Sequence, residues 1–171
     1  MNKTPSLHAR SLYTLIVMML IFLSSCGTRK VATYRETKAA KAAEAMSSLK
    51  SKALYRFITD WTGVRYKLGG LDKRGIDCSG FALLLNKQIY GVDLPRRSVE
   101  QAQVIKEKNA SQLKEGDLVF FSFGGNSIDH VGVYLNHGFF VHASTSRGVI
   151  VDDLNLPAYQ RVLIKAGPVK D

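Results

Sequence analysis

The change from helical to strand-like patterning near residue 114 constrains the fold of this chain most. Before it, apolar residues recur at helical spacing; after it come short apolar runs separated by tight turns. Short strands joined by tight turns after a run of helices indicate an α+β domain with an antiparallel sheet. We expect about five strands, at residues 118–121, 130–135, 138–143, 148–151 and 162–166.

Three helices are predicted before the sheet. The first covers residues 48–61, and the second runs from Cys78 to Gly91. The third begins at Ser98, which has Gln101 in the spacing of a capping box, and it extends to about residue 106. No internal repeat or second domain is evident in the 171 residues.

Cys78 is predicted to lie in the first turn of its helix, because the apolar residues after it recur at helical spacing. They are Phe81, Leu84, Leu85 and Ile89. A thiol at that position feels the positive end of the helix dipole, which favours the thiolate, and a thiolate is a nucleophile and a metal ligand. The alternative is a buried cysteine with a structural role only.

Residues 1–25 have the pattern of an export signal, with a basic start followed by an apolar stretch at 12–23 that is too short to span a bilayer. The stretch ends at Leu23-Ser24-Ser25-Cys26, which resembles a bacterial lipobox. We therefore expect a lipid on Cys26, an anchored protein of the cell envelope, and outer-membrane sorting if the host has that membrane. A short membrane anchor is the alternative. A lipid on Cys26 would leave Cys78 without a disulfide partner.

The net charge of +10 is concentrated near the start of the expected mature chain. Seven basic and two acidic residues lie between 27 and 53, whereas residues 54–171 contain fifteen basic and twelve acidic residues. We expect residues 26–47 to be a basic tether against anionic lipid headgroups, where each cation contributes at most ~1 kcal/mol. No basic stripe interleaved with aromatic residues follows, so nucleic-acid binding is not expected.

Two of the four histidines, His130 and His142, lie in otherwise apolar predicted strands. If their connection were a three-residue loop at 136–138, with Gly138 in the left-handed conformation, Gly132 would face His142. His130 and His142 would then be diagonal neighbours on one face, ~7–8 Å apart. A two-residue loop would place them on opposite faces. The glycine favours the first register, and Gly132 would leave a gap in that face that a helix could approach.

A cysteine nucleophile needs a base, and the base needs a group that fixes its orientation. Cys78, His130 and His142 fill these roles in that order, and the N–H of Cys78 supplies an oxyanion donor. As an alternative, the same three side chains are a possible set of zinc ligands. The expected acyl-transfer chemistry needs no metal or other cofactor.

Six blocks in this order resemble the NlpC-type cell-wall endopeptidases, which are papain-like cysteine peptidases, over about residues 54–163. The blocks are Tyr66-Lys67-Leu68-Gly69-Gly70, Asp77-Cys78-Ser79-Gly80-Phe81, Leu94-Pro95-Arg96, Gly116-Asp117-Leu118-Val119-Phe120-Phe121, His130-Val131-Gly132-Val133-Tyr134 and Phe140-Val141-His142-Ala143-Ser144. The resemblance implies a papain-like domain over residues 48–171. In that fold the nucleophile helix packs on the C-terminal antiparallel sheet.

By the same resemblance, Cys78 is the nucleophile, His130 the general base and His142 the orienting residue. It also implies substrate contacts for Tyr66, Asp77, Ser79 and Arg96. Each of these residues has an alternative, structural role: simple packing for Tyr66, helix capping for Asp77, a backbone contact for Ser79 and a surface charge for Arg96. The family often has threonine where Arg97 stands, so the groove there is expected to differ.

The implied activity is hydrolysis of a bond in the peptidoglycan stem or crosslink by a monomeric enzyme. A non-catalytic wall-binding lipoprotein with the same fold is one alternative. An amidase or acyltransferase on the same scaffold is another.

Overall fold

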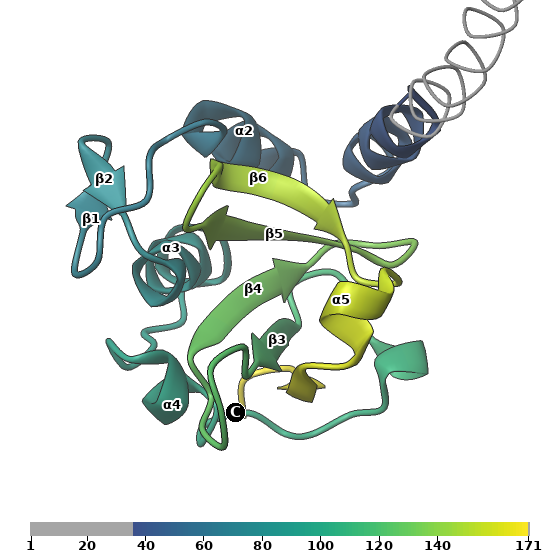
Figure 1. The fold of residues 1–171 in the computed structure, drawn as a ribbon. Coiled ribbons are helices and arrows are strands. Elements are labelled where there is room, and N and C mark those ends of the chain that lie inside the picture. Colours follow the sequence, from purple (N-terminus) through teal and green to yellow (C-terminus); the bar gives the residue numbers. More distant parts are fainter. Residues whose placement is uncertain (1–35, 171) are drawn as a thin grey trace, which may run out of the picture. The chain divides into compact units, whose positions relative to one another are not determined.

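Five antiparallel strands form the main sheet of the computed structural model, which describes residues 36–170 (Figure 1). The strand order is β6-β5-β4-β3-β7. The strands are β3 (Leu118–Phe121), β4 (His130–Tyr134), β5 (Phe139–Ser144), β6 (Gly148–Asp153) and β7 (Leu163–Gly167). Each matches a predicted strand to within two residues, and the α+β class is confirmed.

The other elements precede the sheet or connect its strands. There are four α-helices: α2 (Lys52–Trp61), α3 (Cys78–Leu85), α4 (Ser98–Gln101) and α5 (Pro157–Gln160). The remaining elements are the π-helix η1 (Asn86–Tyr90), the 3₁₀ helix η2 (Ala110–Gln112) and a short hairpin of β1 (Leu71–Asp72) and β2 (Gly75–Ile76). No strands are predicted from the sequence in this hairpin, because two-residue strands are too short to show alternation.

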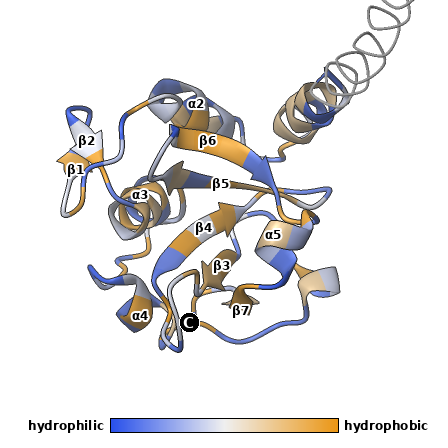
Figure 2. Cartoon of the chain, viewed as in Figure 1, coloured by the Kyte–Doolittle hydropathy of each residue, from blue (hydrophilic) through white to orange (hydrophobic). Residues whose placement is uncertain are grey.

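The central strands β3, β4 and β5 are buried on both faces, and hydrophobic stretches alternate with hydrophilic ones along the sheet (Figure 2). Side chains alternate along a strand, and in β3 Leu118 and Phe120 face the cluster that contains α2 and α3. Val119 and Phe121 face a second cluster, which includes Tyr159 of α5. The sheet therefore lies between two apolar layers, and α3 packs on the first of them.

Helix α2 begins where Ser51 caps it, with the Ser51 hydroxyl accepting a hydrogen bond from the Leu54 N–H at 3.1 Å. Its buried face is Leu54, Phe57, Ile58 and Trp61, as the spacing predicts. The helix starts four residues later than residue 48. The carboxylate of Glu115 accepts hydrogen bonds from the N–H groups of Lys50 and Ser51, which holds the chain before the cap.

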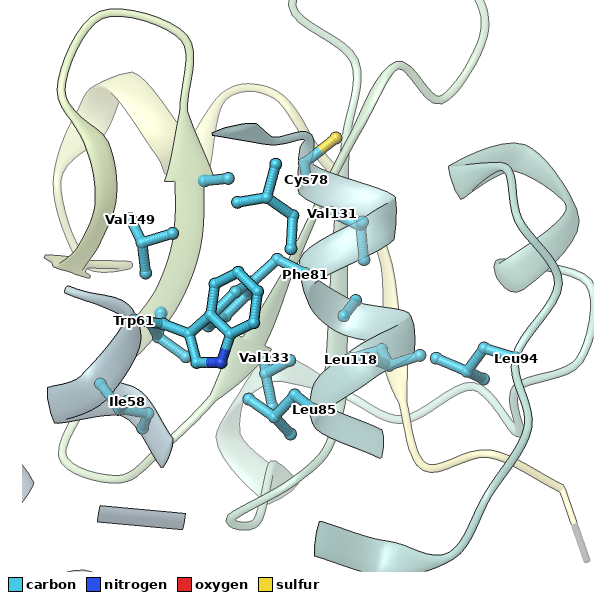
Figure 3. Packing of buried hydrophobic residues seen from close by; sticks show 14 of the residues in the cluster. Ile58, Trp61, Cys78, Phe81, Leu85, Leu94, Leu118, Val131, Val133 and Val149 are labelled. Carbon is cyan, nitrogen blue, oxygen red and sulfur yellow. The ribbon is translucent and has the colours of Figure 1, made fainter. Parts of the chain in front are cut away.

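Helix α3 begins at Cys78 and continues through η1 to Gly91, as predicted. Asp77 is its N-cap, and Gly91 ends it in the left-handed conformation, with φ +69°. Phe81 and Leu85 are fully buried against strands β4 and β5. Figure 3 shows the Cys78 sulfur at the start of the helix, directed away from this apolar cluster.

The connection between β4 and β5 is the three-residue loop that the glycine predicted. Leu135 N–H donates to Phe139 O at 2.9 Å, Gly138 has φ +81°, and Val133 pairs with Val141. This register places His130 and His142 on the same face. The expectation that a helix approaches Gly132 is wrong, because α3 packs on the opposite face of the sheet.

The space above Gly132 is filled by an aromatic ring from the neighbouring strand. A Cβ on Gly132 would lie 2.5 Å from a ring carbon of Phe140, which leaves no room for a side chain. Glycine is therefore needed at this position so that Phe140 can cover the strand.

Helix α4 begins at Ser98, as predicted, but its capping residue is not the predicted one. Arg97 is the N-cap, and its N–H donates to the Glu100 carboxylate at 3.3 Å, so Ser98 and Gln101 do not form a capping box. Gln101 is fully buried instead, where its amide donates to the carbonyls of Ser79 and Pro95. The helix ends at Gln101 rather than near residue 106.

Residues 36–47 are helical, in part of the segment expected to be a tether. The chain divides into two compact units after Lys41, and Ala45 in the second unit is fully buried. Met46 and Leu49 pack against the main core, so this end of the segment joins the domain. Within residues 36–170 no helix is long and apolar enough to cross a membrane. Cys26 and the expected signal lie outside the described residues.

Candidate active site

The Cys78 thiol lies at the junction of α3 and β4 and is 5% exposed. Burial raises the pKa of Cys78, although the backbone N–H groups of Val131, Ser79 and Cys78 itself act in the opposite direction. The N–H groups at the helix start therefore favour the thiolate, as expected, but desolvation outweighs them and the pKa of Cys78 is raised overall.

His130 and His142 form a buried pair on the sheet. His130 Nε2 lies 2.7 Å from His142 Nδ1, and the two rings meet edge to face with centroids 4.9 Å apart. Burial and the neighbouring His142 lower the pKa of His130 to about 3, against a small opposing effect of Asp129. Burial and the neighbouring His142 thus favour the neutral form of His130, which is the state in which an imidazole can accept a proton.

The thiol and the histidine pair come from the two layers of the domain. Cys78 opens a helix on one face of the sheet, and His130 opens β4 with its ring on the other. The N–H of Val131, the residue after His130, acts on the Cys78 sulfur. The two functional groups therefore meet at the end of β4.

Two hollows of about 360 Å³ each open at this junction, and both are lined by Tyr66 and Asp129. One contains Cys78 and the predicted substrate contacts, and the other contains the two histidines. The structure thus brings together all seven predicted site residues: Cys78, His130, His142, Tyr66, Asp77, Ser79 and Arg96. Arg97 also lines the first hollow, in keeping with its expected influence on the groove.

Asp77 organises the first hollow. Its carboxylate accepts two hydrogen bonds from Arg96, at 2.9 and 2.7 Å, and one each from the N–H groups of Gly69 and Gly80, both at 2.7 Å. Burial alone would raise the pKa of Asp77, but Arg96 and these N–H groups outweigh it and lower the pKa. Arg96 also donates a hydrogen bond to the Ser79 hydroxyl at 2.9 Å. Asp77 is thus both the cap of α3 and the ion-pair partner of Arg96.

Several lining residues of the second hollow were not predicted: Phe123, Asp129, Ser144, Thr145 and Tyr159. Tyr159 belongs to α5, a four-residue helix too short to produce a periodic pattern. Asp129 directly precedes His130, which is the one sequence signal that could have drawn attention to it. Its carboxylate accepts hydrogen bonds from Phe123 and Gly124 N–H groups and so shapes the loop beside the hollow.

Among residues 36–170, no three His, Cys, Asp or Glu side chains are arranged to hold a metal ion. His130 and His142 direct ring nitrogens at each other across 2.7 Å rather than at a common point. The zinc-ligand alternative for Cys78, His130 and His142 does not fit this geometry.

The raised pKa of Cys78 predicts how it reacts with iodoacetamide. Only the thiolate is alkylated, so the rate for the free protein should keep rising as the pH passes 9.0, the ordinary pKa of cysteine. The rate is measured from intact mass at a series of pH values, with free cysteine as the reference. A rate that levels off below pH 7 would instead reveal a preformed thiolate and contradict this description.

Comparison with known proteins agrees with the geometry. The model of the NlpC/P60 family matches residues 63–167. The murein DD-endopeptidase MepS/murein LD-carboxypeptidase of Escherichia coli strain K12 is 44% identical over 113 residues, which cover 66% of this chain and 59% of that protein. The chain thus matches less than two thirds of this relative.

Solved structures show the same fold. The crystal structure of an NlpC/P60 family protein from Bacillus cereus ATCC 10987 superimposes with a TM-score of 0.64 at 29% identity, over 71% of this chain and 41% of that one. The NlpC/p60 domain of the peptidoglycan hydrolase SagA gives a TM-score of 0.58 at 30% identity, over 68% of this chain and 97% of that one.

Proposed function

This chain belongs to the NlpC/P60 family, and on that premise we propose that it is a peptidoglycan hydrolase that cleaves an amide bond in the stem peptide or crosslink through a Cys78 acyl-enzyme. The observation that carries the proposal is the placement of a thiol at a helix start near a buried, hydrogen-bonded histidine pair. That arrangement supplies a nucleophile, a base and an orienting group at one point.

In the proposed reaction both Cys78 and His130 begin neutral. The hydrogen bond between His130 Nε2 and His142 leaves His130 Nδ1 to take the thiol proton as sulfur attacks the carbonyl carbon. The N–H of Cys78 donates to the oxygen that gains charge. The imidazolium then protonates the amine that leaves, and a water molecule, deprotonated by His130, hydrolyses the thioester and restores the thiol.

We assign the hollow around Asp77 to the substrate. The Arg96 side chain is 34% exposed there and lines the hollow together with Ser79 and Tyr66. Because Asp77 already accepts several hydrogen bonds, its charge is balanced within the protein. This supports a role for Asp77 in positioning Arg96, while Tyr66, Ser79 and Arg96 present polar groups to the peptide.

We further propose that Cys26 carries a lipid and that the basic residues 26–47 hold the domain near the envelope membrane. The support is the sequence: the lipobox-like Leu23-Ser24-Ser25-Cys26 and the seven basic residues between 27 and 53. Gly27, rather than aspartate, after the cysteine favours the outer membrane. We propose a monomer.

Digestion of purified peptidoglycan tests the function. The wild-type protein should release fragments with new stem-peptide amino groups, seen by mass spectrometry. A crosslinked dimer and a linear tetrapeptide stem are assayed in parallel, because the name of the E. coli relative includes both a DD-endopeptidase and an LD-carboxypeptidase activity. No fragment from either substrate would favour a non-catalytic binding protein, and transfer to an added amine without hydrolysis would favour an acyltransferase.

A further inference from the structure

A buried aspartate lies behind His142, on the side away from His130. In the β5–β6 pairing Asp152 is opposite Phe140 and His142 is opposite Ile150, so Asp152 and His142 share a face of the sheet. Asp152 is 1% exposed, and its Oδ2 lies 3.8 Å from His142 Nε2. We propose that Asp152 is a positioning residue that sets which ring nitrogens of the His130–His142 pair carry protons. Its catalytic part rests on the proposed function.

Two neighbours hold the Asp152 carboxylate in place. The Tyr159 hydroxyl donates to Oδ2 at 2.7 Å, and the Arg147 guanidinium forms an ion pair with the same oxygen at 2.5 Å. Burial and the bond to Asp152 raise the pKa of Tyr159, so its hydroxyl keeps its proton. Arg147 supplies the opposite charge that a buried carboxylate requires. The carboxylate is therefore charged and fixed in direction.

The packing of neighbouring rings fixes the orientation of the His142 ring. Packing does not determine which of its two ring nitrogens carries the proton. Phe140 lies against the ring with centroids 4.8 Å apart and a 31° angle, and His130 meets it edge to face. These contacts are the same whichever ring nitrogen is protonated. Selection requires a charged or hydrogen-bonding group near one nitrogen, and Asp152 is such a group near Nε2.

A negative charge near His142 Nε2 favours the N–H at that nitrogen. His142 Nδ1 is then the acceptor across the 2.7 Å contact, and His130 Nε2 carries the proton that is donated. His130 Nδ1 is left without a proton, as a base for the Cys78 thiol must be. The opposite His142 tautomer would donate to His130 Nε2 and place the proton of His130 on Nδ1, where it could not accept one.

The test is Asp152→Asn, which keeps the size of the side chain and removes its charge. In the full chain labelled with ¹⁵N-histidine, NMR near neutral pH should show His142 protonated at Nε2 in the wild type and shifted toward Nδ1 in the variant. Loss of a carboxylate bonded directly to a catalytic histidine costs about 10⁴-fold in kcat. Asp152 acts over a longer distance and through a second imidazole. We therefore expect kcat to fall by about 10–100-fold, the usual loss when a residue that orients a functional side chain is replaced.

Asp153→Asn is the matched control. Asp153 is the next residue of β6, and its carboxylate accepts hydrogen bonds from Asn155 rather than facing His142. This variant should keep the wild-type tautomer and kcat. The KM of both variants should stay within about twofold of wild type, because neither residue lines the substrate hollow.

Three results would overturn the proposal: a wild-type His142 protonated at Nδ1, an unchanged tautomer in Asp152→Asn, or a changed tautomer with unaltered kcat. The tautomer of His142 in the wild type can be measured without any variant, so this test remains available even if Asp152→Asn fails to fold. The NMR measurement also needs no substrate. A protein that lacks hydrolytic activity altogether but shows the expected tautomers would therefore refute the proposed function and leave the positioning role intact.

Discussion

Replacement of Cys78 by alanine is expected to lower the rate of peptidoglycan hydrolysis by about 10⁴-fold or more, as loss of the nucleophile does in other covalent hydrolases. The physical reason is that the Cys78 sulfur forms the acyl-enzyme in the proposed mechanism. The release of stem-peptide fragments by wild type and variant, followed by mass spectrometry over a time course, measures the effect.

The variant should remain folded, which makes the result interpretable. Alanine removes only the sulfur, and Figure 3 shows that this atom points away from the apolar cluster. The urea unfolding midpoint is therefore expected to stay close to that of wild type. His137→Ala is a matched control, because His137 is an exposed histidine in the β4–β5 turn. Equal fragment release by wild type and Cys78→Ala would refute the thiol mechanism.

Replacement of Asp77 by alanine is expected to reduce the free energy of unfolding by about 3–5 kcal/mol, the usual cost of breaking a buried ion pair on one side. The change removes the cap of α3, takes away the carboxylate that pairs with Arg96, and leaves the Gly69 and Gly80 N–H groups without their acceptor. Urea unfolding measures the loss. Asp93→Ala is the control, since Asp93 is 78% exposed and pairs only with the exposed Lys87 at the surface.

The same residue predicts a dependence of stability on pH. The pKa of Asp77 is lowered by folding, so its contribution is present above the unfolded pKa and is lost as the pH falls through the folded one. The difference between wild type and Asp77→Ala should therefore be largest near neutral pH and shrink in acid. A difference that stays constant from pH 7 to pH 3 would show that Asp77 acts through packing instead of charge.

The strand register could be predicted from the sequence because it depends on local chemistry. Gly138 accepts the left-handed conformation, so the loop length follows, and loop length sets which residues of β4 and β5 share a face. That was enough to place His130 beside His142. The start of α3 was equally local, since Asp77 is a good cap and the apolar spacing begins just after it.

The side of the sheet that α3 covers could not be predicted. Both faces of β3 and β4 are apolar, so alternation distinguishes them but does not say which one meets the helix. The raised pKa of Cys78 was missed for a related reason, because burial comes from residues far apart in the chain. Asp152 was missed because its importance depends on the pairing of β5 with β6 and on a turn of helix at Tyr159.

The origin of the thiol and the imidazoles in two different layers has a consequence for when this protein can be active. Cys78 belongs to the layer of α2 and α3, whereas His130 lies against Phe121 and His142 against Tyr159 in the other layer. Neither layer holds a complete set of reacting groups. In the proposed mechanism the chain therefore acquires activity only when the two layers have docked. A partly folded molecule would lack the complete set of reacting groups.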